Sequence, residues 1–268
     1  MEYTLGLIGA GNMAEAIVRG AIDNGVLPPA KIAAADPSVE RREVFEAMGV
    51  AAYADAAHVV TRSEQIMLAV KPQVFPGLAD AMRRIDRERQ VVISIMAGVK
   101  SAAIEAAAGG STRVVRVMPN TPLMVGAGMS AVAECGRSTA DRSDADLCVE
   151  LLRGCGEVVR VTEDDLDAVT AVSGSGPAYV FLLAEAMTQA AREMGLGDGH
   201  GLLVKQTILG AAKLMLESGD PPEELRRKVT SPGGTTQAAI ASFQADGFEA
   251  VVRRALTAAR DRSVELGE

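Results

Sequence analysis

Short apolar runs alternate with amphipathic stretches along the first part of the chain. The runs are short enough to be strands, and the stretches between them place apolar residues at helical spacing. The predicted strands are residues 3–8, 31–35, 66–70, 91–95, 112–118, 129–133 and 157–161, and the predicted helices are 12–23, 39–48, 74–85 and 141–152. This alternation predicts an α/β fold with a parallel, doubly wound sheet.

After about Thr162 the pattern becomes almost wholly helical, with glycine and proline between the segments. The predicted helices are residues 166–172, 178–194, 199–217, 222–229, 235–245 and 248–266. We therefore place a domain boundary near residue 162. Residues 1–161 are predicted to form the α/β domain, and residues 162–268 an all-α domain.

Two of these helices, 178–194 and 199–217, carry more apolar residues than one amphipathic stripe requires. Such helices are usually buried on more than one side. A domain of this size has little core in which to bury the excess, so we expect the extra apolar surface to contact another subunit. The alternative is that these helices pack only on the first domain of their own chain.

Composition and charge exclude several classes of function. Apolar residues make up 48% of the 268 residues, aromatic residues only 3%, and the net charge is −8. Nucleic acid and anionic membranes are not expected as partners, since either needs a basic surface. The three cysteines show no metal-ligand spacing and are expected to be buried thiols in a reducing cytosol. The N-terminus lacks the features of a signal peptide, and no stretch is expected to be apolar for long enough to span a bilayer. These observations predict a cytoplasmic globular protein.

The first predicted strand is followed by Gly9-Ala10-Gly11-Asn12-Met13-Ala14, the pattern G-x-G-x-x-A. Gly9 permits a tight turn, Gly11 lets the backbone approach a pyrophosphate, and Ala14 lets the helix pack closely on the strand. The free N–H groups at the helix start then bind the phosphates. Because the pattern lies between a predicted strand and a predicted helix, it indicates dinucleotide binding.

The end of the second predicted strand gives conflicting signals on the cofactor. Asp36 stands where an acidic residue binds the adenosine ribose hydroxyls of NAD. Ser38, Arg41 and Arg42 follow it and could instead accept the 2′-phosphate of NADP. Asp36 could also be no more than a helix N-cap. The preference between NADH and NADPH stays open, with NAD favoured slightly by the charge of Asp36.

Further loops lie where ligands bind in such folds, outside the carboxyl ends of the strands. Ala69-Val70-Lys71-Pro72, Met96-Ala97-Gly98 and Met118-Pro119-Asn120-Thr121-Pro122 fit the rim of a nicotinamide site, although each alone could be a turn. In the second domain, residues 173–179 and 230–236 are turns rich in glycine and hydroxyl groups that lead into helices. Such turns bind carboxylates or phosphates, or simply cap a helix.

The motifs GAGNMA, AVKP, MPNTP, SGSGPAY and TSPGGTT, taken together and in order, resemble pyrroline-5-carboxylate reductase over nearly the whole chain. The resemblance implies an N-terminal Rossmann domain and a helical C-terminal dimerisation domain that interleaves with that of a partner. It implies reduction of a cyclic imino acid to proline with NADPH or NADH, in an active site between a subunit's cofactor and second-domain helices. Several members of the family assemble dimers into rings. The partners that the resemblance implies are therefore other copies of the chain, in a homodimer or in a ring of dimers.

The resemblance also implies roles for individual residues. The implied cofactor-binding residues are Ile8, Gly9, Ala10, Gly11, Asn12, Met13, Ala69, Val70, Lys71, Pro72, Ile95 and Ala97, to which Asp36 and Asn120 are added from their places at strand ends. The implied substrate-binding residues are Glu163, Ser231, Gly233, Gly234, Thr235 and Thr236, of which Thr236 is catalytic and hydrogen-bonds the ring nitrogen. Departures at Ala56, Asp36-Pro37 and Lys228 bear on the cofactor preference and leave the reaction class intact.

The chemistry needs no metal, and His58 and His200 have no cluster of ligands around them in the sequence. Catalysis is expected to be positioning: the turn at residues 230–236 holds the substrate carboxylate, and its C=N carbon faces the nicotinamide. One alternative is another NAD(P)-dependent imine or β-hydroxyacid dehydrogenase. The latter needs a catalytic lysine, but Lys205 lacks the expected asparagine, since Leu209 stands four residues on. The other is a non-catalytic dinucleotide sensor, which has no use for a second anion site.

Overall fold

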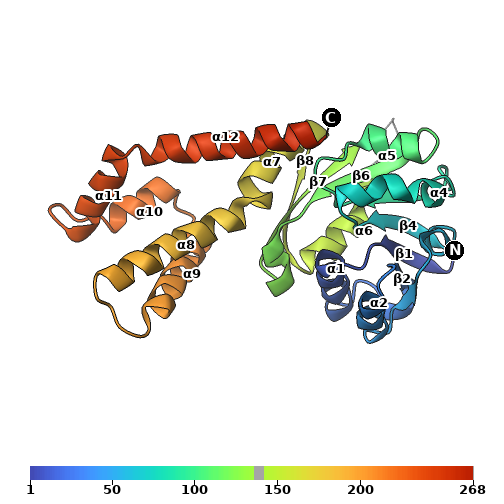
Figure 1. Ribbon diagram of the computed structural model, residues 1–268, viewed down its shortest axis with the longest axis horizontal. Coiled ribbons are helices and arrows are strands. Elements are labelled where there is room, and N and C mark those ends of the chain that lie inside the picture. Colours follow the sequence, from blue (N-terminus) through green and yellow to red (C-terminus); the bar gives the residue numbers. More distant parts are fainter. Residues whose placement is uncertain (136–141, 268) are drawn as a thin grey trace. The chain divides into compact units, whose positions relative to one another are not determined.

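The structure, a computed structural model, describes residues 1–135 and 142–267. The chain divides into two compact units. Unit 1 comprises Met1–Ser175 and Ala259–Glu268, and unit 2 comprises Gly176–Ala258. Figure 1 shows the order of the helices and strands along the chain.

The described part of unit 1 is built on an eight-stranded sheet in the order β3-β2-β1-β4-β5-β6-β7-β8. Its strands are β1 Tyr3–Ile8, β2 Ile32–Ala35, β3 Ala51–Tyr53, β4 Ser63–Leu68, β5 Val91–Ser94, β6 Arg113–Met118, β7 Gly128–Cys135 and β8 Gly156–Val161. β1 pairs in parallel with β2 on one side and with β4 on the other. The chain order therefore reverses at β1, and the loops after β1, β2 and β4 meet at one edge, where a doubly wound sheet binds its ligand.

The sheet is not parallel throughout, which corrects the sequence-based expectation. β6 and β7 pair antiparallel, whereas β7 and β8 are parallel. The connection from Met118 to Gly128 holds only a short 3₁₀ helix, η3 (Thr121–Val125). A parallel crossover needs a dozen or more residues. The chain has too few here, so β7 returns beside β6 in the opposite direction.

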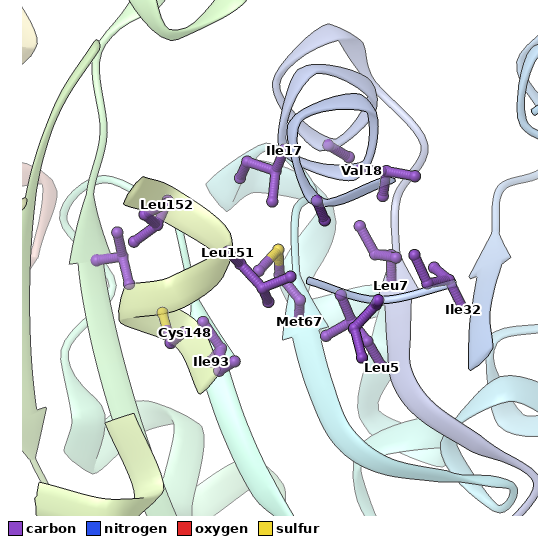
Figure 2. Packing of buried hydrophobic residues seen from close by; sticks show 14 of the residues in the cluster. Leu5, Leu7, Ile17, Val18, Ile32, Met67, Ile93, Cys148, Leu151 and Leu152 are labelled. Carbon is purple, nitrogen blue, oxygen red and sulfur yellow. The ribbon is translucent and has the colours of Figure 1, made fainter. Parts of the chain in front are cut away.

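Helices cover both faces of the sheet. The helical elements of unit 1 before the last are α1 Asn12–Asp23, η1 Pro29–Lys31, α2 Val39–Glu46, α3 Ala56–Val60, η2 Pro72–Leu78, α4 Ala79–Met82, α5 Ser101–Ala107, η3, α6 Arg142–Arg153, η4 Glu163–Asp165, α7 Leu166–Val169 and the π-helix η5 Thr170–Gly174. One buried cluster joins the sheet to α1, α2 and α6, and a second joins it to α3, α4, α5 and α7. Figure 2 shows the first cluster, in which Ile17 and Val18 of α1 and Leu151 of α6 lie against Leu7 and Met67.

Several predicted elements differ from the structure. The predicted helix 74–85 is the 3₁₀ helix η2, which contains Pro76, followed by the short α4. A proline inside a helix removes an N–H donor and clashes with the preceding turn, so a regular α-helix cannot run through it. The predicted helix 166–172 is α7 followed by the π-helix η5. β3, α3 and α5 were not predicted. The predicted start of α6 at Asp141 lies outside the described residues.

The compact unit 1 runs beyond the predicted boundary at residues 161/162, on to Ser175, and it includes the end of the last helix, α12 (Phe248–Leu266). Two contacts account for the extension. Leu166 is buried in the second cluster of the sheet, and the hydroxyl of Ser263 donates a 2.6 Å hydrogen bond to the carboxylate of Asp167. The helical sequence pattern thus begins near Thr162, whereas the compact helical unit begins at Gly176.

Unit 2 is helical, as predicted. It contains α8 Gly176–Glu193, α9 His200–Ser218, α10 Pro222–Lys228, α11 Thr235–Ala245 and the first part of α12. Within its residues, only Ala191 and Val204 are buried apolar side chains. Large apolar side chains such as Phe181, Leu202 and Leu216 are 66%, 70% and 84% exposed. A helical unit with so small a core in a single chain needs a further surface to cover it.

The helical segment Glu163–Glu193 is long and apolar enough to cross a membrane by length and composition alone. The expectation that no stretch would pass this test was therefore wrong. A single such segment is weak evidence for a membrane, because an apolar helix at a protein interface has the same composition.

The three cysteines are free and buried, as predicted. Desolvation raises the pKa of the Cys148 thiol to about 12. The thiol is therefore protonated near neutral pH, and a protonated buried thiol is inert.

Candidate functional site

The turn between β1 and α1 has the conformation that dinucleotide binding requires. Gly9 has φ +99°, and a Cβ atom there would lie 2.7 Å from the carbonyl oxygen of Ala69. Only glycine fits, because L side chains avoid this conformation and because a side chain here would clash with the loop after β4. Gly11 is the N-cap of α1, and a Cβ atom there would meet no protein atom within 4 Å. The space above Gly11 is therefore open to a ligand.

Two cavities meet at this turn. The first, of about 370 Å³, extends past Asp36, Pro37 and Ala56. The second, of about 410 Å³, extends past Met118 and Asn120. Gly11, Ala69, Val70 and Lys71 line both. A dinucleotide has two bulky ends joined by a pyrophosphate, and this pair of cavities offers a place for each end with the glycine turn and the start of α1 between them. We refer to them as the adenosine-side and nicotinamide-side cavities.

Asp36 fixes the glycine turn from the end of β2. One carboxylate oxygen accepts a 2.8 Å hydrogen bond from the Ala10 N–H, and the other accepts a 2.9 Å bond from the Ser38 N–H. A carboxylate has about four acceptor positions. Asp36 therefore holds the turn and retains acceptor positions for ribose hydroxyls.

The basic and hydroxyl groups after Asp36 are engaged within the chain. Ser38 caps α2 by accepting a 3.2 Å bond from the Arg41 N–H. Arg41 donates to the Ala10 carbonyl at 2.5 Å and to Glu15 of α1 at 2.7 Å. Arg42 donates to the carbonyls of Asp36 and Pro37 at 2.8 and 2.9 Å.

Glu15 holds two arginines from the first turn of α1. Besides Arg41, it accepts a 2.9 Å bond from Arg19. Desolvation raises the pKa of Glu15, but the hydrogen bonds from Arg41 and Arg19 outweigh it, so the net pKa is lowered. Glu15 is therefore ionised at neutral pH, and its ion pairs are fully formed.

Asn120 organises the nicotinamide-side cavity. It is 9% exposed, and its side-chain oxygen accepts a 2.9 Å bond from the Met129 N–H. Its amide group donates to the Ser173 carbonyl at 3.3 Å. The loop after β6 is thereby tied to the SGSG segment, and Gly174 of that segment lines the cavity with Asn120.

Most of the predicted cofactor-binding residues line one or both cavities: Ile8, Gly9, Gly11, Asn12, Met13, Asp36, Ala69, Val70, Lys71, Ile95 and Asn120. Ala10, Pro72 and Ala97 line neither. Ala10 is fully buried, and its N–H and carbonyl are bound by Asp36 and Arg41. Ala54, Val74 and Leu78 line the adenosine-side cavity and were missed. Ala54 directly follows β3, and prediction of that strand would have located it.

In unit 2, the turn at residues 231–234 leads into α11. Gly233 has φ +72°, and the Gly234 N–H bonds the Ser231 carbonyl at 3.0 Å. α11 has no side-chain cap, so N–H groups of its first turn lack partners within the helix. Among the described residues, the hydroxyls of Ser231, Thr235 and Thr236 have no hydrogen-bond partner, whereas that of Thr230 donates to the Arg226 carbonyl at 2.6 Å. Unengaged N–H and hydroxyl donors at a helix start suit a carboxylate.

Glu163, predicted to bind substrate, has its carboxylate engaged within unit 1. One oxygen accepts from the Ser101 N–H at 2.8 Å and from Arg116 at 3.0 Å, and the other accepts from the Ser101 hydroxyl at 2.6 Å. Desolvation raises the pKa of Glu163, but the hydrogen bonds from Ser101 and Arg116 lower it by more. The net pKa therefore lies below its ordinary value. The carboxylate caps α5 and neutralises Arg116, which is 7% exposed. Its role toward substrate stays a prediction.

Two protein-family models match the chain. Residues 163–266 match the model described as "Pyrroline-5-carboxylate reductase dimerisation". Residues 4–98 match the one described as "NADP oxidoreductase coenzyme F420-dependent". The two matches fall on the helical part and on the dinucleotide-binding part of the chain.

Full-length relatives agree with these matches. A pyrroline-5-carboxylate reductase of Pseudomonas aeruginosa is 42% identical over 267 residues, covering 98% of this chain and 97% of the relative. One from Methanosarcina acetivorans is 39% identical, with 98% of both covered. The structure of a pyrroline-5-carboxylate reductase from Coxiella burnetii superposes with a TM-score of 0.89 at 37% identity, and that of the Plasmodium falciparum protein with NADP bound superposes with 0.86 at 28%. Both cover 100% of each chain.

Proposed function

Since the chain belongs to the pyrroline-5-carboxylate reductase family, we infer that it reduces 1-pyrroline-5-carboxylate to L-proline with NAD(P)H, the last step of proline biosynthesis. The identity extends over the full length of the relatives, so it covers both units. The observation in the structure that carries the inference is the pair of cavities that meet at the glycine turn. The fold likeness to a 3-hydroxyisobutyrate dehydrogenase, at 15% identity, extends to the fold alone.

In this proposal, residues of unit 1 bind the cofactor and residues of unit 2 bind the substrate. Gly9, Gly11 and the start of α1 hold the pyrophosphate of NAD(P)H, which supplies the hydride when bound. We propose that the hydroxyls of Ser231 and Thr235 and the N–H groups of the first turn of α11 hold the substrate carboxylate. The N–H groups of Gly233 and Gly234 are bound by Gln237 and Ser231. The reaction then requires a proton on the ring nitrogen and a fixed position for the C=N carbon. A protonated cyclic imine is already electrophilic, so positioning supplies most of the rate.

Thr236 is the residue we propose for the ring nitrogen. Its hydroxyl is unengaged and half-buried at the start of α11. Replacing Thr236 by valine removes the hydroxyl at nearly constant volume and is expected to lower kcat/KM for pyrroline-5-carboxylate by about tenfold or more. The measurement is the initial rate of NAD(P)H oxidation at 340 nm. Thr230→Val is the matched control, because that hydroxyl is engaged with Arg226, and it should lose much less. Equal rates for wild type and Thr236→Val would refute the role of Thr236.

We also propose that the enzyme is a homodimer through the helices of unit 2. The match to a dimerisation domain over residues 163–266 shows that the chain carries an oligomerisation domain, and the exposed apolar side chains of α8 and α9 need a cover. Sedimentation analysis should find a species near twice the 27.8 kDa chain mass or a multiple of it. A ring of dimers would appear as a larger even multiple, and a stable monomer would contradict the proposal.

The free, buried cysteines support the cytoplasm as the location.

A further inference from the structure

The described lining of the adenosine-side cavity has one acidic side chain and one basic side chain. Among the described residues, Asp36 and Lys71 are the charged groups that line it, and Ser38, Arg41 and Arg42 do not. Lys71 lines the nicotinamide-side cavity as well. It therefore lies where the two cavities join, at the expected place of the pyrophosphate rather than of the adenosine ribose.

The arginine that could serve a 2′-phosphate is held elsewhere. Arg41 is bound on one side by the Ala10 carbonyl and on the other by the Glu15 carboxylate, at 2.5 and 2.7 Å. The side chains of Arg41 and Glu15 are only 26% and 22% exposed. A partly buried, charge-assisted pair of this kind is stronger than a surface ion pair.

We propose that Glu15 is a positioning residue that sets the cofactor preference: it holds Arg41 away from the adenosine ribose, so that the enzyme uses NADH in preference to NADPH. The inference rests on the proposed function. A 2′-phosphate brings up to two negative charges close to the Asp36 carboxylate. In the described loop after Asp36, Arg41 is paired with the Glu15 carboxylate, and Arg42 donates through one nitrogen to the carbonyls of Asp36 and Pro37, so neither arginine donates to the Asp36 carboxylate. A 2′-hydroxyl can instead donate to Asp36.

The test compares kcat/KM for NADH and NADPH, at saturating pyrroline-5-carboxylate, in wild type and in Glu15→Gln. The wild type should prefer NADH by about tenfold or more, and Glu15→Gln should shift the ratio toward NADPH by about tenfold, since releasing one cation is worth on the order of one charge pair near the surface. The ratio is the readout because a merely structural role of Glu15 would change both cofactors alike.

Two further variants identify Arg41 as the group that Glu15 controls. In the double variant Glu15→Gln/Arg41→Gln the gain for NADPH should disappear, because the released cation is gone. Arg19→Gln removes the other partner of Glu15, which is 53% exposed, and leaves the pair with Arg41 intact. This control should keep the wild-type ratio.

A wild-type preference for NADPH, or an unchanged ratio in Glu15→Gln, would overturn the proposal. So would a double variant that keeps the gain, since the effect would then not pass through Arg41. Kd values for NADH and NADPH from nicotinamide fluorescence give the same ratio without turnover. Absence of pyrroline-5-carboxylate reduction with normal cofactor binding would therefore remove the proposed function, while the ratio of Kd values would still decide the role of Glu15.

Discussion

Gly11→Ala is expected to weaken NAD(P)H binding by roughly ten- to a hundredfold while the fold stays almost as stable, because forcing a methyl group into a filled contact costs about 1–3 kcal/mol. Without cofactor, the new methyl group meets no protein atom within 4 Å, and Gly11 has an ordinary φ of −71°. The change at the N-cap of α1 should cost less than about 1 kcal/mol. With cofactor, the methyl group occupies the space proposed for the pyrophosphate. Fluorescence titration with NADH and thermal unfolding measure the two effects separately.

Two other glycines are matched controls for this result. Gly9→Ala should lose both stability and cofactor binding, because its methyl group would clash with Ala69 in a positive-φ turn. Gly25→Ala also places alanine at positive φ, +69°, but in open space after α1, so it should lose a little stability and no binding. If Gly11→Ala binds NADH as tightly as wild type, the pyrophosphate does not lie over this turn.

Glu163→Gln is expected to destabilise the protein by about 2–3 kcal/mol at pH 7, since it leaves a buried arginine without its counter-ion. Arg116 has only 8% of its side chain exposed, and Glu163 is its ion-pair partner at 3.0 Å. The 29% exposure of Glu163 admits some water, which keeps the loss below that of a fully buried pair. Glutamine retains the shape and one acceptor oxygen, so packing is nearly unchanged. Urea unfolding at fixed protein concentration measures the difference.

The loss should depend on pH in one direction. The pKa of Glu163 is lowered in the folded protein, so its contribution to stability is present above the unfolded pKa of about 4.3 and is lost as the pH falls through the folded pKa. The difference between wild type and Glu163→Gln should therefore shrink below about pH 4. Asp80→Asn is the control, because its ion pair with Arg83 is exposed and should contribute little at any pH. A constant difference across this range would contradict the ionic role of Glu163.

Helices and strands with a clear periodicity of apolar residues could be predicted from the sequence, and those without one could not. β1, α1 and the helices of unit 2 lie close to their predicted ranges because long apolar periodicity determines them. β3 has only three residues, Ala51–Tyr53, which is too short to show alternation. The antiparallel β7 was not foreseen, because its direction follows from the length of the preceding loop rather than from its own residues.

The residues that line the two cavities were largely predictable, since a motif and the ends of strands place them. What local sequence could not give was the pairing of side chains over long separations. Arg41 and Glu15 are 26 positions apart, and Glu163 and Ser101 are 62 apart. Only the fold brings such partners together. For this reason the sequence did not reveal that Arg41 is paired with Glu15, or that Glu163 accepts hydrogen bonds from Ser101 and Arg116.

The measurement that tests the central claim most directly is isotope transfer from the reduced cofactor to proline. Enzyme is incubated with pyrroline-5-carboxylate and with NADH or NADPH carrying deuterium at nicotinamide C4, on the face from which the hydride leaves, and the product is analysed by mass spectrometry and NMR. A pyrroline-5-carboxylate reductase should form one proline for each cofactor oxidised, with deuterium at ring C5. Cofactor oxidation without deuterated proline, or cofactor binding without any proline, would contradict the account.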